Sequence, residues 1–142
     1  MENTLKPRHY KELLIWQKGM ALAKLVYKLS LQFPADERYG LTSQVRRAAV
    51  SVPSNIAEGQ ARHTTKEFLL FLSHAQGSLG ELETQLLLSL ELGYARQEAV
   101  NPGLQEIEEL QKMIVSLKRK LSESSPPATR HLSLSTHGRE RQ

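Results

Sequence analysis

Apolar residues recur along most of the chain at the three- and four-residue spacing that is typical of α-helices. Residues 11–33 carry two such stripes. The first consists of Leu13, Trp16, Met20, Ala23 and Tyr27, and the second of Ile15, Leu22, Val26, Leu29 and Phe33. The stripes lie roughly 100° apart around one helix, so this helix is predicted to bury two faces and to end at Pro34. The second stripe is assigned to an oligomer interface between copies of the chain.

A second helix is predicted from a cap at Thr42 or Ser43 to Gly59, a residue that suits a C-terminal cap. Its apolar face comprises Leu41, Val45, Ala48, Ala49, Val52 and Ile56. Pro53 lies inside this pattern and leaves the carbonyl of Ala49 without its usual helical partner. Because the apolar face continues beyond the proline, we expect one helix kinked at Pro53 rather than two helices.

The third predicted helix begins at the capping box Thr64-Thr65-Lys66-Glu67 and ends at Gly93. Its apolar residues form nearly a heptad seam: Phe68, Leu72, Ala75, Leu79, Leu82, Leu86 and Leu90. Gly77 and Gly80 disfavour a helix interior, so we expect another backbone to pack closely against them. A fourth helix is predicted either from the Asn101-Pro102 cap or from near Gln97, with the stripe Leu104, Ile107, Leu110, Ile114, Leu117 and Leu121.

Four stripes joined by short loops predict an all-α fold, an antiparallel up-down-up-down four-helix bundle over residues 11–121. Residues 1–10 form an N-terminal extension in this interpretation. Residues 122–142 are rich in Ser, Pro, Thr, His and Arg and are expected to be disordered. The apolar surface exceeds what one bundle buries, so the pattern also predicts self-association.

Composition excludes several classes of site. The 142 residues include no cysteine, which excludes a disulfide scaffold, a zinc knuckle, an iron–sulfur cluster and a cysteine nucleophile. No secretory signal is readable, and no apolar run approaches the roughly 18 residues of a membrane span, so a cytoplasmic protein without membrane contact is expected.

No arrangement of residues indicates catalysis. The five histidines, at positions 9, 63, 74, 131 and 137, occur in no Glu-x-x-His or His-Glu-x-x-His pattern. A glycine-rich phosphate loop and a nucleophile elbow are also missing from the sequence. We therefore expect no metal, no cofactor, no catalytic residue and no enzymatic activity.

The net charge of +4 is concentrated in the first half of the chain. Residues 1–40 hold seven basic and four acidic side chains, whereas residues 81–121 hold five basic and seven acidic ones. The candidate nucleic-acid-binding residues are Arg46, Arg47, Arg62, His63, Lys66, Lys24 and Lys28. They point away from the apolar stripes or lie at a helix N-terminus, where free amides suit phosphate. Two interpretations remain open for them: a phosphate-binding surface repeated around an oligomer, or ordinary solubilising charge.

Several segments together resemble a known family. They are Leu14-Ile15-Trp16-Gln17-Lys18, Phe33-Pro34, the run from Glu37 to Ala49, the run from Ser51 to Gly59, Lys66-Glu67-Phe68 and the run from Gly77 to Gln85. Over about residues 12–121 the chain resembles the four-helix-bundle proteins encoded in intervening sequences of bacterial 23S rRNA genes. The accessory variability determinant of diversity-generating retroelements is a more distant relative.

The resemblance implies a ring-like, often pentameric assembly with a basic surface, which in the retroelement branch binds a reverse transcriptase and nucleic acid. It implies no catalytic residues, and among matched positions Arg46 and Arg47 are the best candidates for polyanion contact. The leading hypothesis is a non-enzymatic homo-oligomeric bundle that binds RNA or DNA through phosphates, as an accessory to an RNA element or a reverse transcriptase. The alternative is a protein–protein scaffold whose basic surface serves solubility only.

Overall fold

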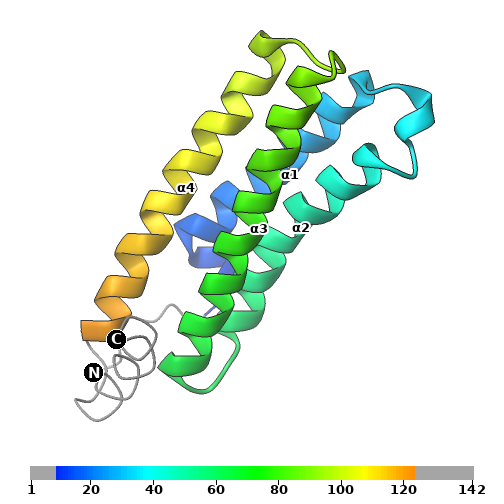
Figure 1. Ribbon diagram of the computed structural model, residues 1–142. Helices are drawn as coiled ribbons and strands as arrows, with labels where there is room; N and C mark the ends of the chain where they lie inside the picture. Colours follow the sequence, from blue (N-terminus) through cyan, green and yellow to red (C-terminus); the bar gives the residue numbers. More distant parts are fainter. Residues whose placement is uncertain (1–8, 124–142) are drawn as a thin grey trace, which may run out of the picture.

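The computed structural model describes residues 9–123 and has the predicted all-α architecture (Figure 1). Its α-helices are α1 (Leu14–Leu29), α2 (Leu41–Gln60), α3 (Thr65–Glu91) and α4 (Gln97–Glu123). Three short 3-10 helices, η1 (Tyr10–Glu12), η2 (Ser30–Gln32) and η3 (Ala35–Glu37), precede or follow α1. Over these residues the structure contains no strand. The predicted disorder of the C-terminal tail falls almost wholly outside the described residues, as does the N-terminal extension up to Arg8.

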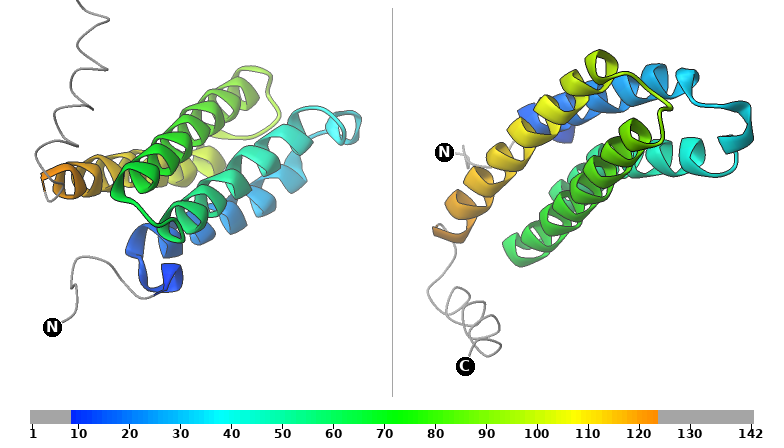
Figure 2. Two further views of the ribbon diagram at one scale, coloured as in Figure 1. Left: turned by 90° about the horizontal axis from the view of Figure 1, so that it is seen from below. Right: turned by 45° about the horizontal axis from the view of Figure 1, so that its top comes forward.

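The helices alternate in direction, and both hairpin loops, α1–α2 and α3–α4, lie at one end of the bundle with the α2–α3 turn at the other (Figures 1 and 2). Each helix packs on the next, and α1 also packs on α4, which closes the bundle. At both ends, helical structure continues beyond the predicted bundle limits of residues 11 and 121. Tyr10 packs its ring against Trp16 at 5.3 Å between ring centroids, and α4 continues two residues past Leu121.

The core contains the predicted apolar faces of all four helices, and it also contains the second stripe of α1. Ile15, Leu22, Val26, Leu29 and Phe33 are 0–7% exposed within a single chain. They belong to the hydrophobic core of the single chain and offer no surface to a second copy, so their assignment to an oligomer interface is wrong. The first stripe is the more exposed one, because Met20 is 40% and Tyr27 44% exposed.

Helix α2 has Gly40 as its N-cap, two residues before Thr42, and its first amide is bound by a carboxylate and not by a hydroxyl. Glu37 Oε1 accepts a hydrogen bond from the Leu41 amide at 2.8 Å, and neither Thr42 nor Ser43 serves as the cap. The helix then runs unbroken through Pro53 to Gln60, which confirms one helix rather than two. Pro53 packs closely against α1, because a Cβ added at Gly19 would lie 3.4 Å from the proline Cβ.

Three glycines have different roles from those predicted. Gly59 lies inside α2 and is not its cap; a Cβ there would lie 2.7 Å from Phe71 Cβ, so the glycine permits close contact between α2 and α3. At Gly77 and Gly80 an added Cβ would meet nothing within 4 Å, so the expected close packing at these positions is wrong for the single chain.

The predicted ends of α3 are confirmed. Thr64 Oγ1 accepts a hydrogen bond from the Glu67 amide at 3.1 Å, and the helix ends before Gly93, whose φ of +75° lies in the left-handed region that favours glycine. Helix α4 begins at Gln97, the earlier of the two predicted starts, and includes Pro102.

Candidate nucleic-acid interface

The two halves of the bundle carry opposite charge. Helices α1 and α2 hold five basic side chains, Lys18, Lys24, Lys28, Arg46 and Arg47, against the single acid Glu58. Helices α3 and α4 hold five basic side chains against nine glutamates. A surface with this partition attracts polyanions to one side of the molecule only. The described structure therefore makes the α1–α2 hairpin the basic half of the bundle.

Five of the seven predicted binding residues are exposed: Lys24, Lys28, Arg47, His63 and Lys66. Lys24 and Lys28 lie on α1, whereas Arg47 lies on α2. His63 and Lys66 lie at the α2–α3 turn, around the start of α3. Because they are exposed, these five side chains can contact a phosphate without any change in the packing of the core.

Arg46 has an internal role. Its Nε donates to Ser30 Oγ at 2.8 Å and its Nη2 donates to the Tyr27 carbonyl at 3.3 Å. The guanidinium also lies 4.7 Å from the centre of the Tyr27 ring. These contacts join α2 to the C-terminal end of α1, so of the arginine pair only Arg47 is fully available to a ligand.

Arg62 is similarly engaged. Its Nη2 donates a hydrogen bond to Glu58 Oε2 at 2.7 Å. Its guanidinium also lies 4.7 Å from the centre of the Phe71 ring. Glu58, to which the sequence assigned no role, thus holds the arginine at the α2–α3 turn. Asn55, also unassigned, donates through Nδ2 to the Ser51 carbonyl at 2.8 Å, within the turns of α2 that surround Pro53.

An apolar groove runs between α1 and α2 on the outer face of the basic half. Its cavity of about 560 Å³ is lined mainly by apolar side chains, among them Trp16, Met20, Tyr27, Val50 and Pro53, with Lys24 as its cationic member. The sequence contains this first stripe of α1, but periodicity alone does not tell which stripe a single chain covers.

A second, polar cavity of about 350 Å³ lies between α2 and α3. Gln44, Arg47, Ala48, Ser51 and Glu81 line it. Ser51 Oγ and Ser78 Oγ are 2.8 Å apart across the same helix pair. Among the lining residues only Arg47 was a predicted binding residue, although Gln44, Arg47, Ser51 and Asn55 recur at helical spacing and indicate a polar edge on α2.

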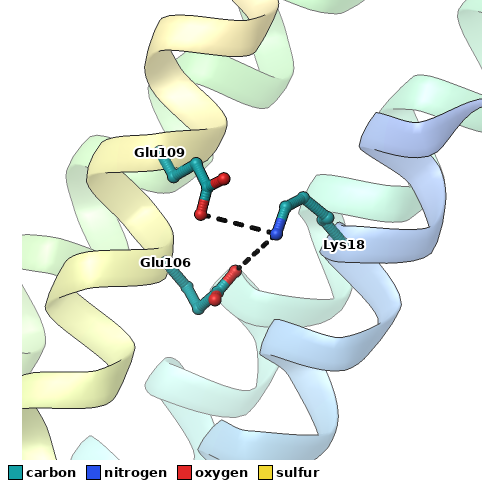
Figure 3. Close-up of polar contacts among 3 residues, drawn as sticks. All are labelled: Lys18, Glu106 and Glu109. Carbon is teal, nitrogen blue, oxygen red and sulfur yellow. Dashed lines mark ion pairs between the residues drawn. The ribbon is translucent and has the colours of Figure 1, made fainter.

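Two lysines are committed to contacts within the bundle. Lys18 of α1 lies between two carboxylates of α4, 3.6 Å from Glu106 and 3.4 Å from Glu109 (Figure 3), and Glu106 in particular raises the pKa of Lys18 above its ordinary value. Lys118 of α4 donates to Ser73 Oγ at 2.8 Å and to Gln76 Oε1 at 2.7 Å on α3, and burial lowers its pKa. These pairs join α4 to its two neighbours.

Within residues 9–123 no group of three or more His, Asp or Glu side chains is placed to hold a metal ion. No helix in the same part of the chain is long and apolar enough to cross a membrane.

Comparison with known proteins identifies the family. No curated protein matches the chain. A solved structure matches with a TM-score of 0.69 at 20% identity over 74% of this chain and 98% of the other; it is a protein of unknown function from the S23 ribosomal protein family of Bacteroides thetaiotaomicron VPI-5482. At this identity the likeness concerns the fold alone. The model of the family described as "23S rRNA-intervening sequence protein" matches residues 11–116, most of the bundle, and the chain therefore belongs to that family.

Proposed function

We propose that the chain is a non-enzymatic, homo-oligomeric bundle that binds RNA or DNA mainly through phosphate contacts. The observation that carries the proposal is the exposed basic half, with Lys24, Lys28 and Arg47 on α1 and α2 and nine glutamates confined to α3 and α4. Such a partition is unnecessary for folding, because exposed charges contribute little to stability. It concentrates attraction for polyanions on one side.

Self-association is the second part of the proposal. The apolar groove around Met20 and Tyr27 takes the place of the buried stripe as the contact between copies. The outer side of α3 fits it in charge and shape, since exposed Leu70, Leu87 and Leu88 lie there among glutamates, and Gly77 and Gly80 leave open space. When two different faces of the chain meet, repeated contacts close into a ring if the rotation between neighbouring subunits allows it. The family resemblance implies that this ring is a pentamer.

The assembly would multiply a few cations per subunit into a continuous basic surface. In this proposal it serves as an accessory to an RNA element or to a reverse transcriptase.

Salt titration of RNA binding tests the phosphate contacts. Wild type is compared with Lys24→Glu/Arg47→Glu, and the matched control is Lys112→Glu/Arg119→Glu, which reverses two exposed charges on α4. Counterion release predicts that log affinity falls linearly with log salt, with a slope smaller by about 0.7 per lost contact to a single strand. The α1–α2 variant should show the smaller slope and weaker binding, whereas the control should match wild type. Equal behaviour of both variants contradicts the proposal.

Sedimentation at micromolar concentration tests the assembly. Met20→Lys introduces a charge into the groove and should give a monomer, whereas Val115→Lys at an exposed position of α4 should leave the oligomer intact. A monomeric wild type contradicts self-association.

The scaffold function remains the second candidate because the groove also fits an apolar protein partner. Copurification from native cells, with and without nuclease, distinguishes the scaffold function from nucleic-acid binding. A protein partner retained after nuclease treatment supports the scaffold, and loss of all partners supports nucleic-acid binding.

A further inference from the structure

The apolar stripe of α4 continues beyond the core of the bundle. Ile114 is the last buried residue of the helix, yet Leu117 and Leu121 follow it at helical spacing and are only partly buried. At the start of α1, Leu14 is 58% exposed. An apolar side chain that stays exposed lacks the stabilisation that burial provides. The described residues therefore leave apolar surface uncovered on the start of α1 and on the end of α4.

A groove of about 340 Å³ joins these two surfaces. It lies between the start of α1 and the last turns of α4, and it is lined by Leu13, Leu14, Ile15, Met113, Ser116, Leu117 and Lys120. Five of these seven side chains are aliphatic or thioether groups. A lining of this kind fits aliphatic side chains, which gain from contact with apolar atoms and need no hydrogen-bond partner.

The chain itself leads out of this groove. Helix α4 ends at Glu123, and the sequence continues to Gln142. Among residues 124–142 the only large apolar side chains are Leu132 and Leu134, and the single residue between them would place both on one side of an extended segment. An extended chain from Glu123 to Leu132 spans up to about 30 Å, whereas Leu117 lies only about 9 Å back along the helix. Both leucines are therefore within reach of the groove.

Two further observations favour the chain's own segment over a separate partner. The family model matches residues 11–116, so Leu117, Lys120 and the two leucines all lie after the matched region and form one addition to the family's bundle. A segment tethered beside its site also meets that site at a millimolar effective concentration, so a few apolar contacts are sufficient for binding.

We infer that residues 131–135 of the same chain dock in this groove, with Leu132 and Leu134 covering Leu14 and Leu117. The docked segment completes the apolar core at the end of the bundle where α1 begins. The groove is thus an intramolecular binding site, and this inference depends neither on nucleic-acid binding nor on self-association.

The absence of cysteine from the sequence allows a direct test with the full chain. Ser116→Cys places a single thiol at an exposed position of the groove, and its rate of reaction with a maleimide reports whether the groove is covered. Adding Leu132→Ser/Leu134→Ser should raise this rate about threefold or more, because the segment is released. Adding Ser133→Ala/Ser135→Ala should leave the rate unchanged. A thiol introduced by Gln105→Cys, at an exposed position of α4 outside the groove, should react equally fast with all three versions of residues 132–135.

The outcomes identify the occupant. Protection of the Ser116→Cys thiol that does not change with protein concentration supports docking within one chain. Protection that grows with protein concentration assigns the groove to a second copy and overturns the inference. An unchanged rate in the Leu132→Ser/Leu134→Ser variant also overturns it, whether the groove is open or is covered by residues 1–8.

Discussion

The α1–α2 hairpin and the α3–α4 hairpin are built on the same apolar period but differ in their surfaces. The first carries excess basic charge, an apolar groove and an arginine that joins its two helices through Ser30 and Tyr27. The second carries excess acidic charge and joins its helices through Lys118, with two glycines facing open space. Because both hairpins contribute buried side chains to one core, the difference concerns partners rather than folding.

The largest effect on stability is expected at the contact between α2 and α3, which joins the two hairpins. Gly59→Ala places a methyl group 2.7 Å from Phe71 Cβ and 3.0 Å from Phe68 Cδ1, at a point where the backbone of α2 approaches α3. We expect a loss of about 2–3 kcal/mol in the free energy of unfolding, measured by chemical denaturation. Gly77→Ala on the outer side of α3 is the matched control and should gain about 0.5–1 kcal/mol. Equal effects of the two substitutions would contradict the assigned packing.

Adjacent arginines on α2 should separate stability from binding. Arg46→Met removes hydrogen bonds to Ser30 and to the Tyr27 carbonyl and should cost about 1–2 kcal/mol in the free energy of unfolding. Arg47→Met should leave that free energy nearly unchanged and weaken RNA binding, because its side chain is exposed. Urea denaturation and anisotropy on both variants check this. A destabilised Arg47 variant, or an Arg46 variant of wild-type stability, would refute the distinction.

A smaller effect is expected where the two hairpin loops meet. Glu37 accepts hydrogen bonds from the Leu41 amide and from the Tyr94 hydroxyl, each at 2.8 Å, and these hold its pKa below the ordinary value, the Leu41 amide most strongly. A depressed pKa in the folded state contributes stability that is present above the unfolded pKa and is lost as pH falls through the folded pKa.

Tyr94→Phe should therefore lower Tm near neutral pH, where the hydrogen-bonded Glu37 carboxylate contributes stability, and change Tm little at the acid end, which flattens the acid side of the Tm profile. Thermal melts across the acidic range, from neutral pH to below the ordinary pKa of a glutamate, measure this. Leu121→Ala, far from the loops at the C-terminal end of α4, controls for a general loss of stability and should keep the wild-type slope. A Tyr94→Phe profile parallel to that of wild type would show that the loop contact does not set the pKa of Glu37.

By itself, the sequence determined the helices, their order and most of the core, because helical periodicity and caps such as Thr64 and Gly93 depend on residues a few positions apart. It also contained the uneven charge, since the basic and acidic residues belong to different helices.

Only the tertiary structure decided which stripe of α1 is covered, because both stripes satisfy the same spacing and the choice depends on the angle at which α1 meets α2 and α4. It also decided which candidates remain free: Arg46 and Arg47 are neighbours in sequence, but 100° of helical rotation directs one to Tyr27 and leaves the other exposed. Contacts between helices, such as that of Arg46 with Tyr27, join residues far apart in the sequence and are therefore beyond the reach of local pattern.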